Sequence, residues 1–119
     1  MMPLVTIGVP FYNSQDYIID TLNSIKYQTY SHIQLILVND CSTDHSLALV
    51  KGWLIQNSSS FSDVILIENA QNRGTSFSCK KIEENANGVF FCKVDADDLI
   101  HSNKINTQVQ YLIKNPEVA

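Results

Sequence analysis

Four short runs of apolar residues divide the chain, and each is rich in branched side chains. They occupy residues 4–9, 33–38, 64–67 and 89–94. The runs are almost continuously apolar rather than alternating, which is typical of parallel strands covered on both faces. Successive runs are separated by enough residues for a crossover helix. The pattern therefore predicts four parallel strands that alternate with helices.

Helical spacing fills the first two stretches between these runs. Asn13 and Ser14 are N-cap candidates for the first helix, because short side chains that accept hydrogen bonds favour this position. A second helix is predicted to start at Ser42 or Thr43, with Asp44 near its positive end. The residues spaced for burial are Ile18, Leu22 and Ile25 in the first helix, and Leu47, Val50 and Leu54 in the second.

Two further helices are predicted at residues 75–86 and 102–114. Pro116 terminates the second of them, because the residue before a proline is pushed out of the helical conformation. The residues spaced for burial are Cys79, Ile82 and Ala86 in the first, and Ile105, Val109, Leu112 and Ile113 in the second.

The right-handed crossover rule makes these elements a twisted parallel sheet with helices on both faces. Ligands of such α/β folds bind at the carboxyl edge of the sheet. The segments that follow the four strands are residues 10–13, 39–44, 68 onward and 95–98, and they are rich in carboxylates, amides and hydroxyls. We expect these polar groups to converge at one end of the sheet.

Composition indicates an ordinary globular domain. The chain has 119 residues, of which 45% are hydrophobic and 17% charged, so it can bury a core as a single domain. The formal charge of −4 argues against nucleic acid as a partner, because nucleic-acid binders concentrate basic residues. No apolar run approaches the ~20 residues of a spanning helix. We therefore expect no transmembrane segment in this chain.

The three cysteines, Cys41, Cys79 and Cys92, form no CxxC pair and are odd in number. Such usage favours a reducing compartment, with the thiols as small buried groups. The amino-terminal residues also lack the basic start of a signal peptide. A cytoplasmic location is predicted, with any membrane association carried by regions outside these residues.

The acidic cluster Asp95-Ala96-Asp97-Asp98 directly follows the fourth apolar run. Three carboxylates within four residues repel one another, and a divalent cation relieves that repulsion. Magnesium and manganese take oxygen ligands and often use one or two carboxylates together with substrate phosphates. The plainer alternative is a set of solvated turn residues or helix caps. Position after an apolar strand favours the metal site.

Four other residues are candidates for ligand contacts. Asp40 stands at a strand exit, where a carboxylate could accept a hydrogen bond from a base imide or a ribose hydroxyl. Tyr12, which follows Pro10 at the end of the first run, could stack on a nucleobase, although a core tyrosine fits the pattern equally well. Arg73 lies in Asn72-Arg73-Gly74, which reads either as a plain turn or as a donor fork for a diphosphate at a helix start.

With these motifs in order, the chain resembles the family 2 inverting glycosyltransferases of the GT-A fold, a Rossmann-like α/β class. The resemblance runs from Leu4 to the last residues. The five motifs that carry it are Val9-Pro10-Phe11-Tyr12-Asn13-Ser14, Gln28-Thr29-Tyr30, Val38-Asn39-Asp40-Cys41-Ser42-Thr43-Asp44, Asn72-Arg73-Gly74 and Val94-Asp95-Ala96-Asp97-Asp98.

The resemblance implies a role for each matching residue. Pro10 and Tyr12 would line the nucleotide pocket, and Asp40 would recognise the base, usually uracil. Asp95 would face the ribose or the metal shell, and Asp97 would bind Mn2+ or Mg2+ as part of a DXD motif. The donor is then a nucleotide-diphosphate sugar, and the metal would bridge its diphosphate.

Two positions depart from the family pattern. Cys79-Lys80 stands where the family often has an Arg-Asn pair, so either the diphosphate contacts are weaker or Lys80 and Lys81 replace them. Cys41 stands where a glycine is usual after the Asp40 position. That change is tolerable if the backbone of Cys41 is not left-handed.

The resemblance also implies a hexosyltransferase in which an acceptor hydroxyl attacks the anomeric carbon with inversion. The general base and the acceptor-binding segments of the family lie beyond the matching stretch, so we expect them beyond residue 119. Residues 1–119 are then a single donor-binding domain with little or no turnover by itself. A glycan or lipid-linked acceptor, and a role in cell-surface polysaccharide synthesis, are expectations of the family.

Three other classes compete with this interpretation. A non-catalytic nucleotide-sugar binding module fits the same residues. A phosphoacceptor receiver domain needs an acidic pair after its first strand, where this chain has Pro10-Phe11. A nucleotidyltransferase needs a glycine-rich basic loop at the same place, which residues 10–14 do not provide.

Overall fold

The computed structural model describes residues 2–117. Its strands form one sheet in which every pairing is parallel, in the order β3-β2-β1-β4. The strands are β1 (Val5–Phe11), β2 (Ile33–Asn39), β3 (Asp63–Glu68) and β4 (Phe90–Lys93). Each coincides with a predicted apolar run to within two residues at either end. The predicted four-stranded parallel sheet is therefore confirmed.

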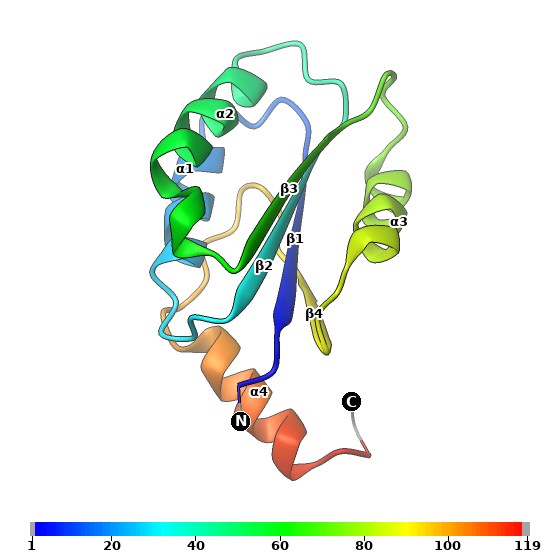
Figure 1. Cartoon of the computed structure of the whole chain (residues 1–119). Coiled ribbons are helices and arrows are strands. Elements are labelled where there is room, and N and C mark those ends of the chain that lie inside the picture. The colour runs from blue at the N-terminus through cyan, green and yellow to red at the C-terminus, as the bar shows by residue number, and fades with distance from the viewer. Residues whose placement is uncertain (1, 118–119) are drawn as a thin grey trace.

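Helices cover both faces of the sheet, as predicted for an α/β fold of this kind. The helical elements are α1 (Ile18–Lys26), α2 (Ser46–Asn57), the short 3-10 helix η1 (Ser58–Ser60), α3 (Thr75–Asn85) and α4 (Lys104–Lys114). Figure 1 shows α1 and α2 on one side of the sheet and α3 on the other, with α4 beyond the amino-terminal end of the strands. Within the described residues, none of these helices is long and apolar enough to cross a membrane.

The main hydrophobic core lies between the sheet and the helices α1, α2 and α4. Side chains of a strand alternate between the two faces of the sheet, and the odd-numbered residues of β1 point into this core. A smaller cluster beneath α3 consists of Ile36, Val38 and Ile82. Every residue of β1 and β2 is buried, which explains why their sequences are mostly apolar rather than alternating.

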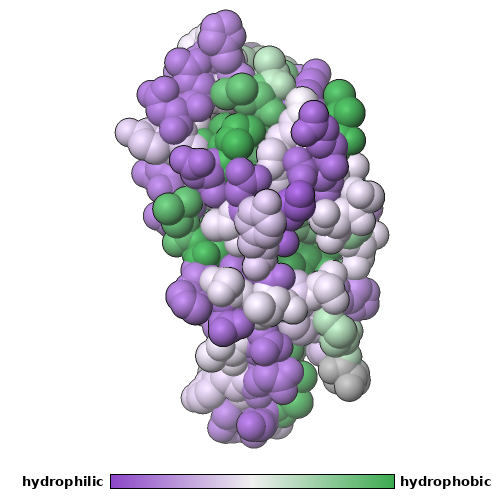
Figure 2. Space-filling view, turned by 90° about the vertical axis from the view of Figure 1, so that its left-hand side faces the viewer, coloured by the Kyte–Doolittle hydropathy of each residue, from purple (hydrophilic) through white to green (hydrophobic). Residues whose placement is uncertain are grey.

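The outer surface over α1 and α2 is mostly hydrophilic. Figure 2 shows this side of the molecule, where hydrophobic residues occur in small groups among polar ones. Ile18, Leu22 and Ile25 of α1 are fully buried, so the predicted apolar stripe faces the sheet. In α4 the stripe is confirmed at Ile105 and Val109, whereas Ile113 remains 39% exposed.

The path of the chain creates a switch point between β1 and β4. From β1 the chain moves outward to β2 and β3, and it then crosses the opposite face through α3 to reach β4 on the other side of β1. In open α/β sheets, ligands bind outside the carboxyl ends of the strands at such a reversal. A ligand site is therefore expected at the segments that follow β1 and β4.

Two predicted helix starts are several residues too early. The helix α1 begins at Ile18 rather than after Asn13 or Ser14, and α2 begins at Ser46 rather than at Ser42 or Thr43. The side chain of Asn13 is occupied elsewhere, because its Oδ1 accepts the backbone N–H of Thr43 at 2.8 Å. These polar residues join the loop after β1 to the loop after β2, and α1 and α2 begin only after these loops.

The last helix also begins later than predicted, at Lys104 rather than Ser102. The backbone carbonyl of Ser102 accepts the N–H of Thr29 at 2.9 Å, which ties this residue to the segment after α1. By contrast, α3 spans Thr75–Asn85 and agrees with the predicted 75–86 to within one residue.

A buried polar network fixes the connection that leads into β4. Thr6 Oγ1 donates to Gln34 Oε1 at 2.6 Å, and both residues are fully buried in neighbouring strands. Thr6 Oγ1 accepts the N–H of Gly88 at 2.9 Å, and Gln34 Oε1 accepts the N–H of Asn87 at 2.8 Å. Because each buried polar atom in this set has a partner, the network holds the start of β4 against β1 at little cost.

The helix α3 packs directly on β1 at Gly8. A Cβ atom at this position would lie 2.5 Å from Ile82 Cγ2. Ile82 is the largest fully buried side chain of α3, so the absence of a side chain at Gly8 sets the distance between helix and sheet.

Gly8→Ala is expected to destabilise the fold by about 1–3 kcal/mol, because a tightly packed interface accommodates an added methyl group only by shifting. Gly52→Ala is the matched control: Gly52 lies in α2 with no atom near its missing Cβ, and alanine should stabilise that helix by about 0.5–1 kcal/mol. Urea unfolding of the three proteins measures both effects. A wild-type midpoint for Gly8→Ala would contradict this account of the packing.

Candidate functional site

Pro10 ends the hydrogen-bond ladder between β1 and β4. The even-numbered residues of β1 direct their backbone groups toward β4, since Gly8 accepts the N–H of Val94 at 2.9 Å. The next such residue, Pro10, has no N–H to donate. The chain after Val94 is therefore released from the sheet at this level, and the acidic cluster begins with the next residue.

The acidic cluster forms a tight turn. The N–H of Asp98 donates to the carbonyl of Asp95 at 3.0 Å, which closes the turn around Ala96 and Asp97. Ala96 is buried in the main core, whereas Asp95, Asp97 and Asp98 are exposed. The turn thus presents the carboxylates of the DXD motif to solvent on either side of a buried anchor.

Asp95 already has a cationic partner. Lys93 Nζ lies 3.2 Å from Asp95 Oδ1, as two residues on the same side of an extended segment allow. This hydrogen bond to Asp95 is the main reason that the pKa of Lys93 lies above its ordinary value. A cation approaching Asp95 must therefore compete with the ammonium group of Lys93.

Asp40 is almost fully buried, at 5% exposure, and its carboxylate organises the segment before α3. Its Oδ1 accepts the N–H of Arg73 at 2.8 Å and the side-chain amide of Asn69 at 3.0 Å. Its Oδ2 accepts the N–H of Gly74 at 2.8 Å. Burial acts to raise the pKa of Asp40, but these donors outweigh it and hold that pKa below its ordinary value.

Asp40 keeps limited capacity for a further donor. An ionised carboxylate offers about four acceptor positions, and the three bonds above occupy Oδ1 twice and Oδ2 once. Beside it, Asn69 Oδ1 is buried and has no hydrogen-bond partner within residues 2–117. Asp40 Oδ2 and Asn69 Oδ1 are both hydrogen-bond acceptors, so this part of the site suits a ligand group that donates hydrogen bonds.

Tyr12 is 45% exposed, which excludes the alternative that it is a core tyrosine. The loop that carries it is tied to the loop after β2. Asn13 N–H donates to Ser42 Oγ at 3.1 Å, and Ser14 N–H donates to Ser46 Oγ at 2.7 Å. These bonds hold the backbone next to Tyr12 at the carboxyl edge of the sheet, while the exposed ring of Tyr12 stays accessible to a ligand. Pro10, by contrast, is buried within the strand.

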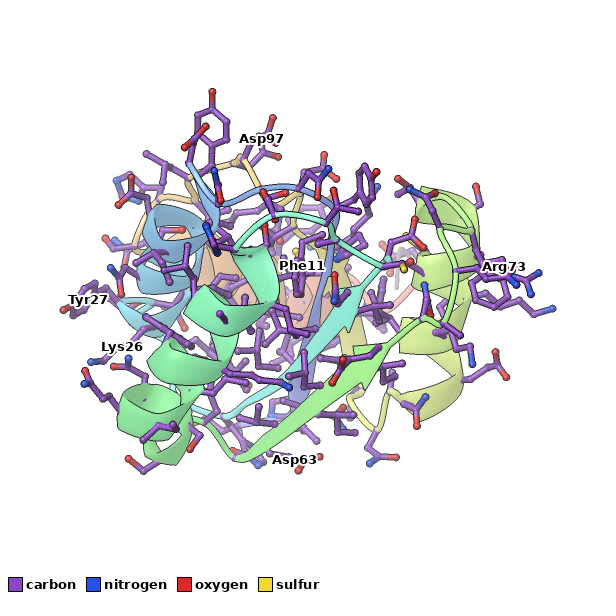
Figure 3. The ribbon with its side chains drawn as sticks, turned by 90° about the horizontal axis from the view of Figure 1, so that it is seen from above. Phe11, Lys26, Tyr27, Asp63, Arg73 and Asp97 are labelled. Atoms are coloured by element: carbon purple, nitrogen blue, oxygen red, sulfur yellow. The ribbon has the colours of Figure 1, made fainter. Side chains whose placement is uncertain are left out.

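Arg73 lies apart from the acidic turn. Its guanidinium stands over the ring of Phe77, 5.4 Å from the centroid, and Figure 3 shows it on the outer side of α3, well separated from Asp97. It lines a hollow of about 310 Å³, together with Glu68, Asn69, Ala70, Gln71, Phe77 and Lys81. The fold thus places Tyr12, Asp40 and Asp95 after three adjacent strands, β1, β2 and β4, but does not bring Arg73 to Asp97.

The two departures from the family pattern have different outcomes. Cys41 adopts a left-handed backbone with φ of +62°, so the condition under which a residue other than glycine is tolerable there is not met. A side chain in this conformation costs roughly 1–2 kcal/mol. Lys80 is exposed, and Lys81 Nζ lies 5.5 Å from the centroid of Phe77. Within residues 2–117, neither lysine forms an ion pair with the acidic turn. The prediction that the thiols are buried is wrong, since all three cysteines are half-buried.

The chemistry of the donor set at the turn fits a hard divalent cation. Asp95 and Asp97 offer exposed carboxylate oxygens, which magnesium and manganese accept. No group of three or more histidine, cysteine or acidic side chains within residues 2–117 is placed to hold a metal by itself. Such a pair matches a site that is completed by phosphate oxygens of a ligand rather than a closed protein cage.

Sequence reasoning missed two residues of the site region. Asn69 bridges Asp40 Oδ1 and Ser78 Oγ, at 3.0 and 3.1 Å. Asn69 lies two residues after the end of the third apolar run, as Asp40 lies two residues after the end of the second, and this equivalence was the available signal. Thr21 donates from α1 to the carbonyl of Ala96 at 2.8 Å, and no local pattern marks a polar residue in an apolar helix stripe for this contact.

A parallel sheet in the order β3-β2-β1-β4, with polar groups gathered at its switch point, defines a Rossmann-like α/β domain. The family model described as "Glycosyl transferase family 2" matches residues 6–119. The chain therefore belongs to glycosyl transferase family 2, which sets aside the receiver-domain and nucleotidyltransferase alternatives.

Relatives of known name or structure agree with this assignment. The chain is 31% identical over 111 residues to Glycosyltransferase GlyG of Streptococcus pneumoniae serotype 4, covering 92% of this chain and 35% of that protein. It matches the structure of S. aureus TarS 1–349 in complex with UDP-GlcNAc with a TM-score of 0.83 and 26% identity, over 92% of this chain and 31% of TarS 1–349.

A second solved structure is the mannosyltransferase PcManGT from Pyrobaculum calidifontis in complex with GDP-Man and Mn2+. The match has a TM-score of 0.87 and 26% identity and covers 94% of this chain and 33% of that one. The chain thus spans well under half of the length of these three relatives. The four-stranded sheet and its helices are the part that is shared.

Asp40→Asn is expected to destabilise the protein by about 2–3 kcal/mol, because an amide cannot accept all three donors and a buried N–H is left unpaired. Since the folded-state pKa is lowered, the stability that Asp40 contributes is present above its ordinary pKa of about 3.9 and is lost as pH falls through the lowered value. Urea unfolding at neutral pH and near pH 3 should therefore show a difference between the two proteins that shrinks at low pH. A difference independent of pH would contradict the role of the charge.

Proposed function

We propose that the chain binds a nucleotide-diphosphate sugar, with uridine as the nucleoside, together with Mn2+ or Mg2+. The whole protein would transfer the sugar to an acceptor hydroxyl with inversion. The observation that carries the proposal is the position of an exposed aromatic after β1 and of the acidic turn after β4, on the two strands that flank the switch point of a family 2 fold. The nucleotide sugars bound by TarS and PcManGT support it by similarity.

Each residue has a specific part in this proposal. Tyr12 stacks on the nucleobase, since its ring is exposed on a loop held in place by hydrogen bonds. Asp40 accepts a hydrogen bond from the base imide through its unused acceptor position. Pro10 lines the bottom of the nucleotide pocket. Asp95 and Asp97 hold the cation, with Asp95 also in reach of the ribose. Arg73, which lies over Phe77, would have to change its side-chain conformation to meet a diphosphate.

The proposed reaction forms a bond between the acceptor oxygen and the anomeric carbon. The bond from the anomeric carbon to the diphosphate oxygen breaks, and its electron pair leaves with the nucleoside diphosphate. The acceptor proton passes to a general base, which the matching motifs of residues 1–119 do not supply. A cation held by Asp95 and Asp97 would stabilise the charge of the leaving diphosphate.

Asp97→Asn is expected to abolish the metal-dependent part of nucleotide binding. In wild-type protein, UDP with Mn2+ should raise the melting temperature more than UDP alone, because a ligand that binds only the native state stabilises it. Isothermal titration with UDP, with and without Mn2+, quantifies the difference, for which we expect about tenfold. Titration with GDP tests the choice of nucleoside.

Glu84→Gln is the matched control for this experiment, since it makes the same change from carboxylate to amide at an exposed position of α3. It should retain the response to Mn2+. Equal responses to UDP with and without Mn2+ in wild type and Asp97→Asn would overturn the metal assignment. An absence of binding to both UDP and GDP by wild-type protein would overturn the nucleotide assignment.

Lys93→Met is expected to tighten Mn2+ binding in the presence of UDP by about two- to fivefold. The ammonium of Lys93 no longer competes for Asp95, and an exposed ion pair of this kind is worth at most about 1 kcal/mol. Lys51→Met is the control, because it breaks the other surface ion pair, with Glu68, and changes the net charge equally. Identical changes in both variants would show that only net charge matters.

A further inference from the structure

One face of α1 carries polar side chains that point inward, although the helix otherwise buries an apolar stripe. Thr21 is fully buried, Ser24 is half-buried and Gln28, just after the helix, is 8% exposed. Their spacing of three and four residues places them in one row along the helix. Buried polar residues are retained when they have partners, so the row points to a specific contact.

Outside α1 itself, the partners of this row lie between the acidic turn and the first turn of α4. Thr21 Oγ1 donates to the carbonyl of Ala96 at 2.8 Å, and Ser24 Oγ accepts the N–H of Ile100 at 3.2 Å. Gln28 Nε2 donates to the carbonyl of His101 at 2.7 Å. Figure 1 shows this segment, coloured yellow to orange, running from β4 past α1 to α4. The row therefore holds a loop that has no regular structure of its own.

Thr21 contacts the acidic turn at its centre. Ala96 is the residue between Asp95 and Asp97, and its side chain is buried in the main core while its carbonyl is fixed by Thr21. The turn itself is closed by a single backbone bond from Asp98 to Asp95. With its side chain packed and its carbonyl bonded, Ala96 fixes the backbone from which the carboxylates of Asp95 and Asp97 project.

We propose that Thr21 is a positioning residue for the divalent cation: its hydroxyl fixes the peptide between Asp95 and Asp97 so that both carboxylates face one ion. This inference rests on the proposed metal site. Groups behind the ligands of a metal site control affinity, and their loss typically weakens it by about 10–100-fold. The same contact explains why a threonine interrupts the apolar stripe of α1.

Thr21→Val tests the proposal, because valine keeps the shape of the side chain and removes only the hydroxyl. The Mn2+ affinity is measured in the presence of UDP by electron paramagnetic resonance of free Mn2+, and the UDP affinity without metal by isothermal titration. We expect Mn2+ binding to weaken about tenfold and metal-free UDP binding to stay within about twofold. Thr21→Ser, which restores the hydroxyl, should bind Mn2+ within about threefold of wild type.

Three results would overturn the proposal. Wild-type Mn2+ affinity in Thr21→Val, alongside a loss in Asp97→Asn, would remove the role of Thr21 and leave the proposed function intact. Equal weakening of Mn2+ and metal-free UDP binding would show that Thr21 serves only the fold. Lack of any response to Mn2+ in wild-type protein would remove both the proposal and the metal site beneath it.

A second variant covers the case in which Thr21→Val does not fold. Ser24→Ala removes the acceptor of the Ile100 N–H, which lies further along the same segment, and leaves the contact of Thr21 with Ala96 in place. A smaller weakening of Mn2+ binding, of about two- to threefold, is expected because the loop is loosened away from the turn. In that case, unchanged Mn2+ affinity in Ser24→Ala would overturn the proposal, because the contacts from α1 to this segment would then have no influence on the cation.

Discussion

The double pairing of β1 is the constraint on which the rest of the structure depends. This strand pairs with β2 along its whole length and with β4 over only its first four residues, and all seven of its residues are buried. The shorter ladder ends because Pro10 offers no N–H beyond Val94. On the side of β2, the pairing of β1 leads into the ordered loops around Asp40. On the side of β4, the pairing stops where the acidic turn begins. The asymmetry of a single strand creates both halves of the site.

The strands β1 and β2 could be predicted from sequence because burial on two faces leaves a nearly continuous apolar run, whereas β3 and β4 are apolar runs that stay partly exposed. The strands were located to within two residues, and α3 to within one, since continuous apolar runs and helical spacing are local properties. The starts of α1 and α2 could not be located in this way. Asn13 resembles an N-cap locally, but its side chain is satisfied by Thr43 thirty residues away. Partners so distant in sequence leave no periodic signal.

The sequence indicated which residues lie at the candidate site, but not how their side chains are arranged. The exposure of Tyr12 and of the acidic turn agrees with the roles that their positions after strands suggested. The carboxylate of Asp40 was expected to face a ligand, yet most of its hydrogen-bonding capacity holds the segment before α3. The stacking of Arg73 on Phe77 joins residues four apart at the start of α3, but the sequence does not show that this contact turns Arg73 away from the acidic turn. The left-handed backbone of Cys41 has no signature in the local sequence.

The carboxylate of Asp40 joins two regions that the sheet otherwise keeps apart. Its side chain accepts the N–H groups of Arg73 and Gly74, directly before α3, and its own backbone N–H donates to the carbonyl of Phe11 at the end of β1 at 2.9 Å. Under the proposed function, a donor on the ligand would share this carboxylate with the two N–H groups. Linkage would then make the effect reciprocal, so that ligand binding and the order of the segment before α3 would each bias the other. The start of α3 would in that case respond to the ligand without touching it.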